Sequence, residues 1–159
     1  MTDPVLLTEL PRRGVLAGVD HGTKRIGIAV SDAAQTFSMP VTTLEAKSAV
    51  HNAAMFRKVR DDYRVQGWVI GLPYLKSGDE GPQALLVRRF GDWLAEMTER
   101  PVAYWDERLT SHAAEVLLSS LGEAPGGVKA RVDGLAAQLI LQAYLRHRTA
   151  TTDDTESPS

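Results

Sequence analysis

The stretch GVLAGVDHGTKRIGIAVSD, residues 14–32, contains two apolar runs, and each run ends at an acidic residue. The runs VLAGVD (15–20) and RIGIAVSD (25–32) are apolar enough to be inner β-strands, and the four residues between them are few enough for a hairpin turn. Gly22 suits a turn position that requires a positive φ. The stretch therefore predicts two paired strands, with Asp20 at the point where the first strand ends.

The rest of the sequence predicts strands and helices in an order that is typical of α/β proteins. Three further strands are expected over 37–45, 67–73 and 102–107, and four helices are expected from Ser48, from Pro82, from Thr110 to Gly122, and over 129–148 after a turn at Gly126–Gly127. Pro40 favours an edge position or a bulge for the third strand. Successive strands are typical of an antiparallel meander, and strands separated by helices are typical of parallel crossovers. We therefore expect a mixed sheet with helices on its faces.

The composition is that of a soluble globular protein with one domain. The chain has 159 residues, of which 43% are hydrophobic and 24% are charged, and this length suffices for a sizeable core. It has no apolar run long enough to cross a membrane, no secretory signal and no cysteine, so we expect a cytoplasmic protein with no membrane partner. We expect a single domain over 14–149, a loose lead-in over 1–13, and a disordered acidic tail over 150–159.

The net charge of −2 by itself argues mildly against a nucleic-acid-binding protein. The tail, however, contains three acids and no base, so the rest of the chain is close to neutral. A site for a polyanion must therefore come from the local placement of bases.

Three carboxylates are expected near the ends of their elements. Asp20 ends the first strand, Glu107 ends the last strand, and Asp133 opens the last helix. Ligands of open α/β sheets gather at the carboxyl ends of the strands, and neighbouring first and last strands would bring Asp20 and Glu107 side by side. Carboxylates packed together repel one another unless cations lie between them, and oxygen ligands of this kind suit Mg²⁺ or Mn²⁺. Asp106 competes with Glu107 for this role, because alternation along a strand places the two on opposite faces.

Several bases and polar side chains lie close to these acids in the sequence. The bases that could hold phosphates are Lys24, Arg25, Arg108 and Lys129. Lys129 and Asp133 are four residues apart and share a helix face. Thr110 is a further candidate for contacting the substrate, and His112 could act as a general base or orient a phosphate.

The acids also have purely structural interpretations. Asp20 is a common residue type at a turn, and Asp133 could simply complement the positive end of a helix. Lys129 and Asp133 could form a surface ion pair that contributes less than ~1 kcal/mol. His112 could be an exposed residue of a helix start. The spacing alone therefore leaves a metal site and an ordinary set of element ends both open.

Four motifs in fixed order resemble the YqgF family, which is also called the RuvX or Holliday junction resolvase family. The motifs are VDHGTKRIGIAVSD (19–32), VIGLPYLKSGDEGPQA (69–84), DERLTSHAAE (106–115) and KARVDGLAAQLIL (129–141). The resemblance extends from about Gly14 to Leu145. It implies an RNase H-like fold with a five-stranded mixed sheet, whose first three strands are antiparallel and whose later strands are parallel, flanked by helices.

The resemblance also implies a divalent-metal-dependent nuclease, with Asp20, Glu107 and Asp133 as the metal-binding acids. Two ions held by such acids could activate a water and stabilise the leaving oxygen in phosphodiester hydrolysis. Members of the family are assigned to 5′-end processing of pre-16S ribosomal RNA, to Holliday junction resolution and to DNA repair. The loop after GLP departs from the family, which usually has Asn, an apolar residue, Asp or Asn, Gly, and Ser or Thr where this chain has Tyr74 to Asp79. Tyr74 could stack on an unpaired base and Lys76 could meet a phosphate, or both could simply cover the loop.

Other functional classes compete with the nuclease. The Asp-x-Gly-Thr hairpin also begins sugar kinases and actin-like ATPases, which suggests a nucleotide-binding module, although those proteins close two such domains over the nucleotide. A protein that binds nucleic acid without cleaving it is a third possibility. Within the nuclease interpretation the substrate could be RNA or branched DNA. The protein could be a monomer or a homodimer, and a two-fold symmetric junction would favour a dimer with two sites.

Overall fold

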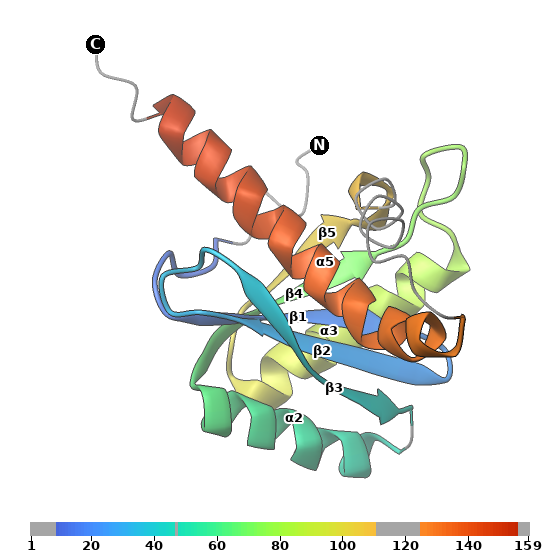
Figure 1. The fold of residues 1–159 in the computed structure, drawn as a ribbon. Coiled ribbons are helices and arrows are strands. Elements are labelled where there is room, and N and C mark those ends of the chain that lie inside the picture. Colours follow the sequence, from blue (N-terminus) through green and yellow to red (C-terminus); the bar gives the residue numbers. More distant parts are fainter. Residues whose placement is uncertain (1–8, 47, 111–124, 156–159) are drawn as a thin grey trace.

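The computed structural model describes residues 9–46, 48–110 and 125–155, and the side chains of 49, 125–133 and 150–155 are not among the features described. The elements follow one another as β1 (Val15–His21), β2 (Arg25–Ser31), β3 (Ser38–Glu45), α2 (Ala49–Tyr63), β4 (Val65–Leu72), α3 (Pro82–Thr98), β5 (Val102–Asp106), the 3₁₀ turn η1 (Glu107–Leu109) and α5 (Pro125–Thr155). Figure 1 shows three layers, with α5 across one face of the sheet and α2 and α3 on the other. No helix in these ranges is both long and apolar enough to cross a membrane.

The five strands form one mixed sheet in the order β3-β2-β1-β4-β5. The pairs β1–β2 and β2–β3 are antiparallel, and the pairs β1–β4 and β4–β5 are parallel. This arrangement confirms the predicted meander followed by parallel crossovers. The expected turn also forms, since the backbone N–H of Gly22 donates to the carbonyl of Arg25 over 2.9 Å.

Gly22 is required for a different reason from the one that the sequence suggested. Positive φ among the described glycines occurs at Gly14 and Gly78, so the expectation of a positive φ at Gly22 is wrong. A Cβ on Gly22 would instead lie 2.7 Å from the carbonyl oxygen of Arg25. The tight turn therefore needs glycine because its backbone approaches itself too closely for a side chain.

Strand β3 is an edge strand with an irregular register, as Pro40 predicted. The register changes between Ile28, which faces Thr42, and Ala29, which faces Pro40, so β3 has one extra residue at this point. Proline has no N–H to donate, and a bulge on an edge strand accommodates it without the loss of a ladder hydrogen bond.

Helices α2 and α3 cover one face of the sheet through a core of aliphatic and aromatic side chains. The largest of these are Phe56 and Trp68, which are fully buried and meet edge to face at 5.5 Å. The indole N–H of Trp68 donates to the hydroxyl of Thr98 over 2.9 Å, and this contact fixes the end of α3 on β4. Both helices begin as predicted, α2 after the N-cap Ser48 and α3 with Pro82 in its first turn.

Helix α5 covers the other face and approaches the sheet closely. A Cβ on Gly18 would lie 2.7 Å from both the carbonyl oxygen of Ala137 and Cβ of Leu141, so glycine in β1 permits this contact. Leu10 is buried in the same layer, and the guanidinium of Arg148 donates to its carbonyl over 2.7 Å. The part of the lead-in from residue 9 onward is therefore fixed to α5, whereas the sequence predicted a loose segment.

The limits of α5 also differ from those expected. The helix begins at Pro125, so Gly126 and Gly127 lie inside it, where a turn was predicted. It continues to Thr155, whereas a disordered tail was predicted from residue 150. A helix that packing has already nucleated adds one hydrogen bond for each further residue, which lets it extend into a poor helix-forming sequence. The helix predicted from Thr110 to Gly122 falls on residues 111–124, outside the described ranges.

Candidate active site

Asp20 and Glu107 belong to strands that are not neighbours. We expected the two acids to lie side by side if the first and last strands were neighbours. The strands are not neighbours, because β4 lies between β1 and β5. Asp20 lies in β1 one residue after Val19, which faces Ile70 of β4. Glu107 does not end β5 but begins the turn η1 directly after it. The two acids are therefore brought together across the end of the intervening strand.

A glycine in β4 makes this approach possible. Gly71 follows Ile70, so it lies at the level of Asp20, and a Cβ at Gly71 would lie 2.7 Å from Oε1 of Glu107 and 2.9 Å from its Cγ. The side chain of Glu107 thus occupies the space that a side chain at position 71 would fill. The signal for this position in the sequence is the Gly-Leu-Pro at 71–73, which directly follows a buried run.

The electrostatics of Glu107 show that the acids act on one another. Burial, together with the negative charges of Asp20 and Asp106, raises the pKa of the Glu107 carboxyl to about 7. A carboxylate in such a position is stabilised by a cation that binds between the acids. The donor set therefore fits a divalent metal, since clustered carboxylate oxygens are the ligands that Mg²⁺ and Mn²⁺ prefer.

Asp106, the rival of Glu107, is engaged elsewhere. Its carboxylate accepts from the backbone N–H of Arg108 over 2.9 Å and forms an ion pair with the Arg108 guanidinium at 2.7 Å. The first contact caps η1, so Asp106 shapes the turn from which Glu107 projects. Thr110 closes the same turn, because its buried hydroxyl donates to the carbonyl of Glu107 over 2.7 Å. Its hydroxyl therefore has a structural partner already.

The hairpin between β1 and β2 forms a cavity of about 300 Å³ beside Asp20. Its lining residues are Asp20, Gly22, Thr23, Lys24, Arg25 and Gly27. Lys24 and Arg25, both exposed, are the bases that were expected to meet phosphates. The structure brings these two bases together with Asp20 in one cavity.

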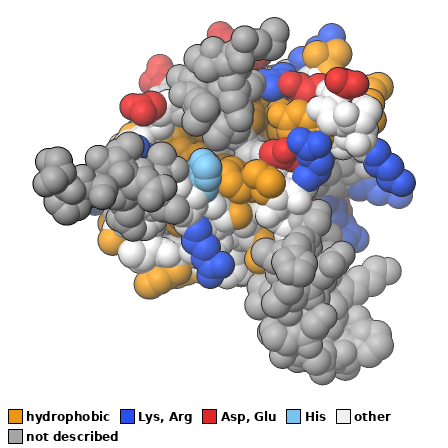
Figure 2. All heavy atoms as spheres, turned by 90° about the horizontal axis from the view of Figure 1, so that it is seen from above, with side chains coloured by type: hydrophobic (Ala, Val, Ile, Leu, Met, Phe, Trp, Pro, Cys, Tyr) orange, Lys and Arg blue, Asp and Glu red, His pale blue; other side chains and the backbone are white. Residues whose placement is uncertain are grey.

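The loop after β4 carries Tyr74 and Lys76. Lys76 is exposed, and Tyr74 is partly buried against the core under α3. The Tyr74 ring lies beneath the guanidinium of Arg108, with the Cζ of Arg108 4.6 Å from the ring centroid. The bases of this side of the molecule are mixed with acidic and hydrophobic side chains, as Figure 2 shows for the face seen from above.

Three predicted site residues are not placed by the described part of the structure. His112 falls in 111–124, and the side chains of Lys129 and Asp133 lie outside the description, although both residues belong to α5. Asp133 lies one helical turn before Ala137, whose carbonyl packs over Gly18 of β1. Among the described side chains no group of three acids or histidines is close enough to hold a metal ion. The described part of the candidate metal site is therefore Asp20 and Glu107.

Comparison with known proteins gives agreement in sequence and in fold. The sequence pattern of the RuvX family, described as Holliday junction resolvase, matches residues 14–147. A protein of Chloroflexus aurantiacus with the name "Putative pre-16S rRNA nuclease" is 41% identical over 134 residues, which cover 84% of this chain and 88% of that protein. A protein of Cereibacter sphaeroides with the same name is 41% identical over 142 residues, which cover 87% of each.

A solved structure of T. thermophilus RuvC in complex with a Holliday junction substrate matches with a TM-score of 0.55 and 17% identity. The match covers 87% of this chain and 97% of that chain. At this identity the match shows a common fold, and it confirms the expected RNase H-like arrangement of a five-stranded mixed sheet with flanking helices.

Proposed function

The chain belongs to the RuvX family of Holliday junction resolvases, and we propose that it is a metal-dependent nuclease that hydrolyses phosphodiester bonds. The observation that carries the proposal is the position of Glu107 over Gly71, level with Asp20 at the carboxyl ends of the parallel strands, where the charge of Asp20 acts on the Glu107 carboxyl. A carboxyl group whose pKa is raised by burial and by a neighbouring acid, as that of Glu107 is, suits a site where a cation binds. The sequence relatives named as nucleases support the same function.

Each described residue of the site has a role in this proposal. Asp20 and Glu107 hold Mg²⁺ or Mn²⁺, with Asp133 of α5 as the third acid. When bound as a pair, such ions would supply Lewis-acid chemistry for the hydrolysis of a phosphodiester bond. Lys24 and Arg25 bind phosphates in the hairpin cavity next to Asp20 and thereby position the backbone of the nucleic acid. Thr110 and Asp106 support the turn from which Glu107 projects.

The leading substrate is ribosomal RNA, specifically the 5′ end of pre-16S RNA, and the site of action is the cytoplasm. The names of the sequence relatives support pre-16S ribosomal RNA as the substrate. The alternative substrate is a Holliday junction, which the family description favours. A symmetric junction needs two active sites, so resolution requires a homodimer, whereas RNA processing is compatible with a monomer.

The first experiment tests cleavage with labelled single-stranded RNA, single-stranded DNA and a four-way junction. Each substrate is incubated with Mg²⁺, Mn²⁺ or EDTA, and the wild type is compared with Asp20→Asn and Glu107→Gln. Asp62→Asn, which changes an exposed acid of α2 on the opposite side of the sheet, is the matched control. We expect metal-dependent cutting that both site variants lose and the control retains.

The other outcomes discriminate between the functional classes. Cleavage that survives Asp20→Asn or Glu107→Gln would remove that residue from the site. Binding of nucleic acid without cutting, by a folded protein and with every metal, would favour the binding protein. Binding of ATP instead would favour the nucleotide-binding module.

A further inference from the structure

Arg108 connects the turn of Glu107 to the loop that follows β4. Its guanidinium donates to Asp106 through Nη2 over 2.7 Å and through Nε over 3.0 Å. The same guanidinium lies over the ring of Tyr74, at 4.6 Å from the centroid. A Cβ on Gly78 would lie 3.6 Å from Nη1 of Arg108, so the guanidinium also reaches the tip of the loop. Arg108 is thus held between a carboxylate on one element and an aromatic ring on another.

The loop itself has the internal contacts of an ordered turn. The backbone N–H of Leu75 donates to the carbonyl of Asp79 over 2.8 Å. The backbone N–H of Gly78 donates to the carbonyl of Leu75 over the same distance. Leu75 also packs so closely on Gly81 that a Cβ there would lie 2.8 Å from its Cδ2. At the far end of the loop, Glu80 forms a two-pronged ion pair with Arg88 of α3. The loop is therefore fixed at both ends, to α3 by Glu80 and to η1 by Arg108.

These contacts change the interpretation of Tyr74 and Arg108. The Tyr74 ring packs on the core on one side and is covered by Arg108 on another, so little of it is available to stack on a base. Arg108 has its guanidinium committed to Asp106 and Tyr74, which weighs against a primary role in binding phosphate. Lys76 is the exposed cation of the loop.

We propose that Arg108 is a positioning residue, which clamps the loop 74–80 to the turn of Glu107 and so holds Lys76 at a fixed place beside the active site. The clamp consists of Asp106, Arg108 and Tyr74. The loop therefore has a fixed conformation at the edge of the substrate site before the substrate binds. Tyr74 acts by holding Arg108 and does not stack on the substrate. This inference rests on the proposed function for its account of the substrate, but the clamp itself can be tested without activity.

The first test measures the mobility of the loop. The chain has no cysteine, so Ser77→Cys at the loop tip provides a single position for a nitroxide label. We expect a restricted spectrum in this background and a clearly more mobile one after Arg108→Ala or Tyr74→Leu. Tyr74→Phe, which keeps the aromatic ring, should preserve the restricted spectrum. Arg89→Ala, at an exposed arginine of α3, is the control for the loss of a positive charge.

The second test asks whether Tyr74 and Arg108 act as one unit on the substrate. Binding of labelled single-stranded RNA in EDTA is measured for Tyr74→Leu, for Arg108→Ala and for the double variant. Each single substitution should weaken RNA binding about threefold to tenfold. The double variant should bind RNA as well as the single variant that has the lower affinity. Losses that multiply would show that the two residues contact the RNA independently, and this would overturn the proposal.

The outcomes separate this proposal from the function itself. A restricted label in both Arg108→Ala and Tyr74→Leu, with the folded state confirmed by circular dichroism, would overturn the clamp whatever the activity. A label that becomes mobile in a protein that neither binds nor cuts RNA would support the clamp and refute the proposed function.

Discussion

Glu107 depends on the absence of a side chain at Gly71. The carboxylate lies over the α-carbon of Gly71, and Ile140 of α5 closes the same space from the other layer. At the scale of single residues, the candidate site is therefore as much a property of this glycine as of the acids. The pair Asp106–Arg108 adds a second constraint, since it fixes the turn that carries Glu107.

Gly71→Ala should impair the site more than the fold. The new Cβ would lie 2.7 Å from Oε1 of Glu107 and 2.6 Å from Cδ1 of Ile140, so both side chains must move. We expect a loss of stability of about 1–3 kcal/mol in urea unfolding and at least about a tenfold loss of cleavage. Gly67→Ala in the same strand, where the nearest contact is 3.0 Å and belongs to a flexible Leu10 side chain, is the control. Equal activity losses in both variants would contradict the role of Gly71.

The raised pKa of Glu107 predicts how the metal-free protein responds to pH. The pKa is 4.5 ordinarily and about 7 in the folded chain, so the unfolded state releases its proton first as pH rises. The contribution of Glu107 to stability is present below pH 4.5 and is lost between pH 4.5 and 7. In EDTA, the wild type should therefore lose folding stability relative to Glu107→Gln when the pH is raised from about 5 to about 8. We expect the difference between their free energies of unfolding to change by about 1–3 kcal/mol in favour of the variant. Urea unfolding at both pH values measures this difference, and an unchanged difference would contradict the burial of the charge.

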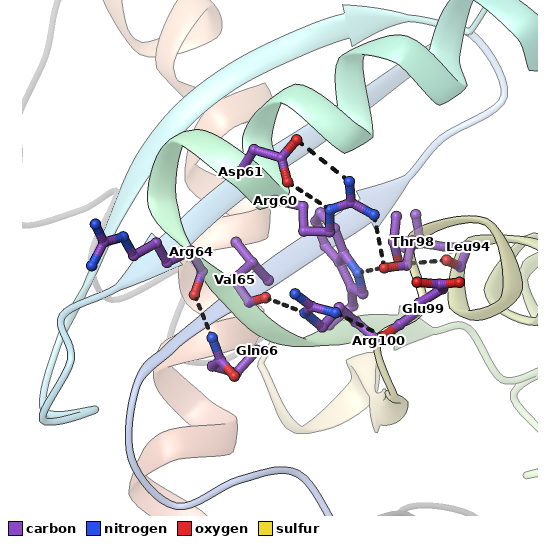
Figure 3. Close-up of polar contacts among 10 residues, drawn as sticks. Arg60, Asp61, Arg64, Val65, Gln66, Leu94, Thr98, Glu99 and Arg100 are labelled. Atoms are coloured by element: carbon purple, nitrogen blue, oxygen red, sulfur yellow. Dashed lines mark hydrogen bonds and ion pairs between the residues drawn. The ribbon is translucent and has the colours of Figure 1, made fainter.

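At the scale of elements, α2 and α3 both end at residues with a left-handed conformation that are not glycine. Arg64 has φ 56° and Glu99 has φ 55°, and in each case the backbone N–H of the capping residue donates to a carbonyl of the last turn. The carbonyl of Thr98 at the end of α3 also accepts from Arg60 of α2 (Figure 3). Hydrogen bonds thus compensate for an unfavourable backbone conformation at these ends.

Glu99→Gly should stabilise the protein, because glycine adopts this conformation without strain. We expect the free energy of unfolding to rise by about 0.5–1 kcal/mol in thermal or urea unfolding. This figure is a net gain, because glycine also makes the unfolded chain more flexible and so favours unfolding. Glu96→Gly, at an exposed position inside α3, should lose about 1 kcal/mol and serves as the matched control. Destabilisation by both substitutions would show that the side chain of Glu99 itself stabilises the helix end.

At the scale of the whole molecule, a net charge of −2 gives no general attraction for a polyanion. The described bases that we expect to contact phosphates are few, and they lie on two separate segments, the hairpin with Lys24 and Arg25 and the loop with Lys76, because the guanidinium of Arg108 is engaged with Asp106 and Tyr74. The affinity for nucleic acid should therefore come from a small number of phosphate contacts, with a modest dependence on salt.

Lys24→Ala and Lys76→Ala should each weaken binding of single-stranded nucleic acid with little regard to its sequence. Each should also reduce the slope of log affinity against log salt by about one. Fluorescence anisotropy over a range of KCl concentrations measures both effects. Lys58→Ala, at a lysine of α2 that forms an ion pair with Asp62, should change neither. A slope that Lys76→Ala leaves unchanged would remove this lysine from the substrate site.

Local sequence patterns predict the order of the elements, the hairpin, the edge position of Pro40 and the starts of α2 and α3. Each of these depends on residues close together in the chain, where periodicity and the chemistry of proline, glycine and capping side chains act directly. It also singled out Asp20 and Glu107 through their motifs.

The way in which the two acids approach each other follows from the fold and not from local sequence patterns. Their encounter depends on β4, which the chain inserts between β1 and β5, and on the missing side chain of Gly71. The pairing of Arg108 with Tyr74 likewise joins residues more than thirty positions apart. Contacts of this kind arise from strand order and packing between layers, and neither leaves a periodic signal in the sequence around the residues that take part.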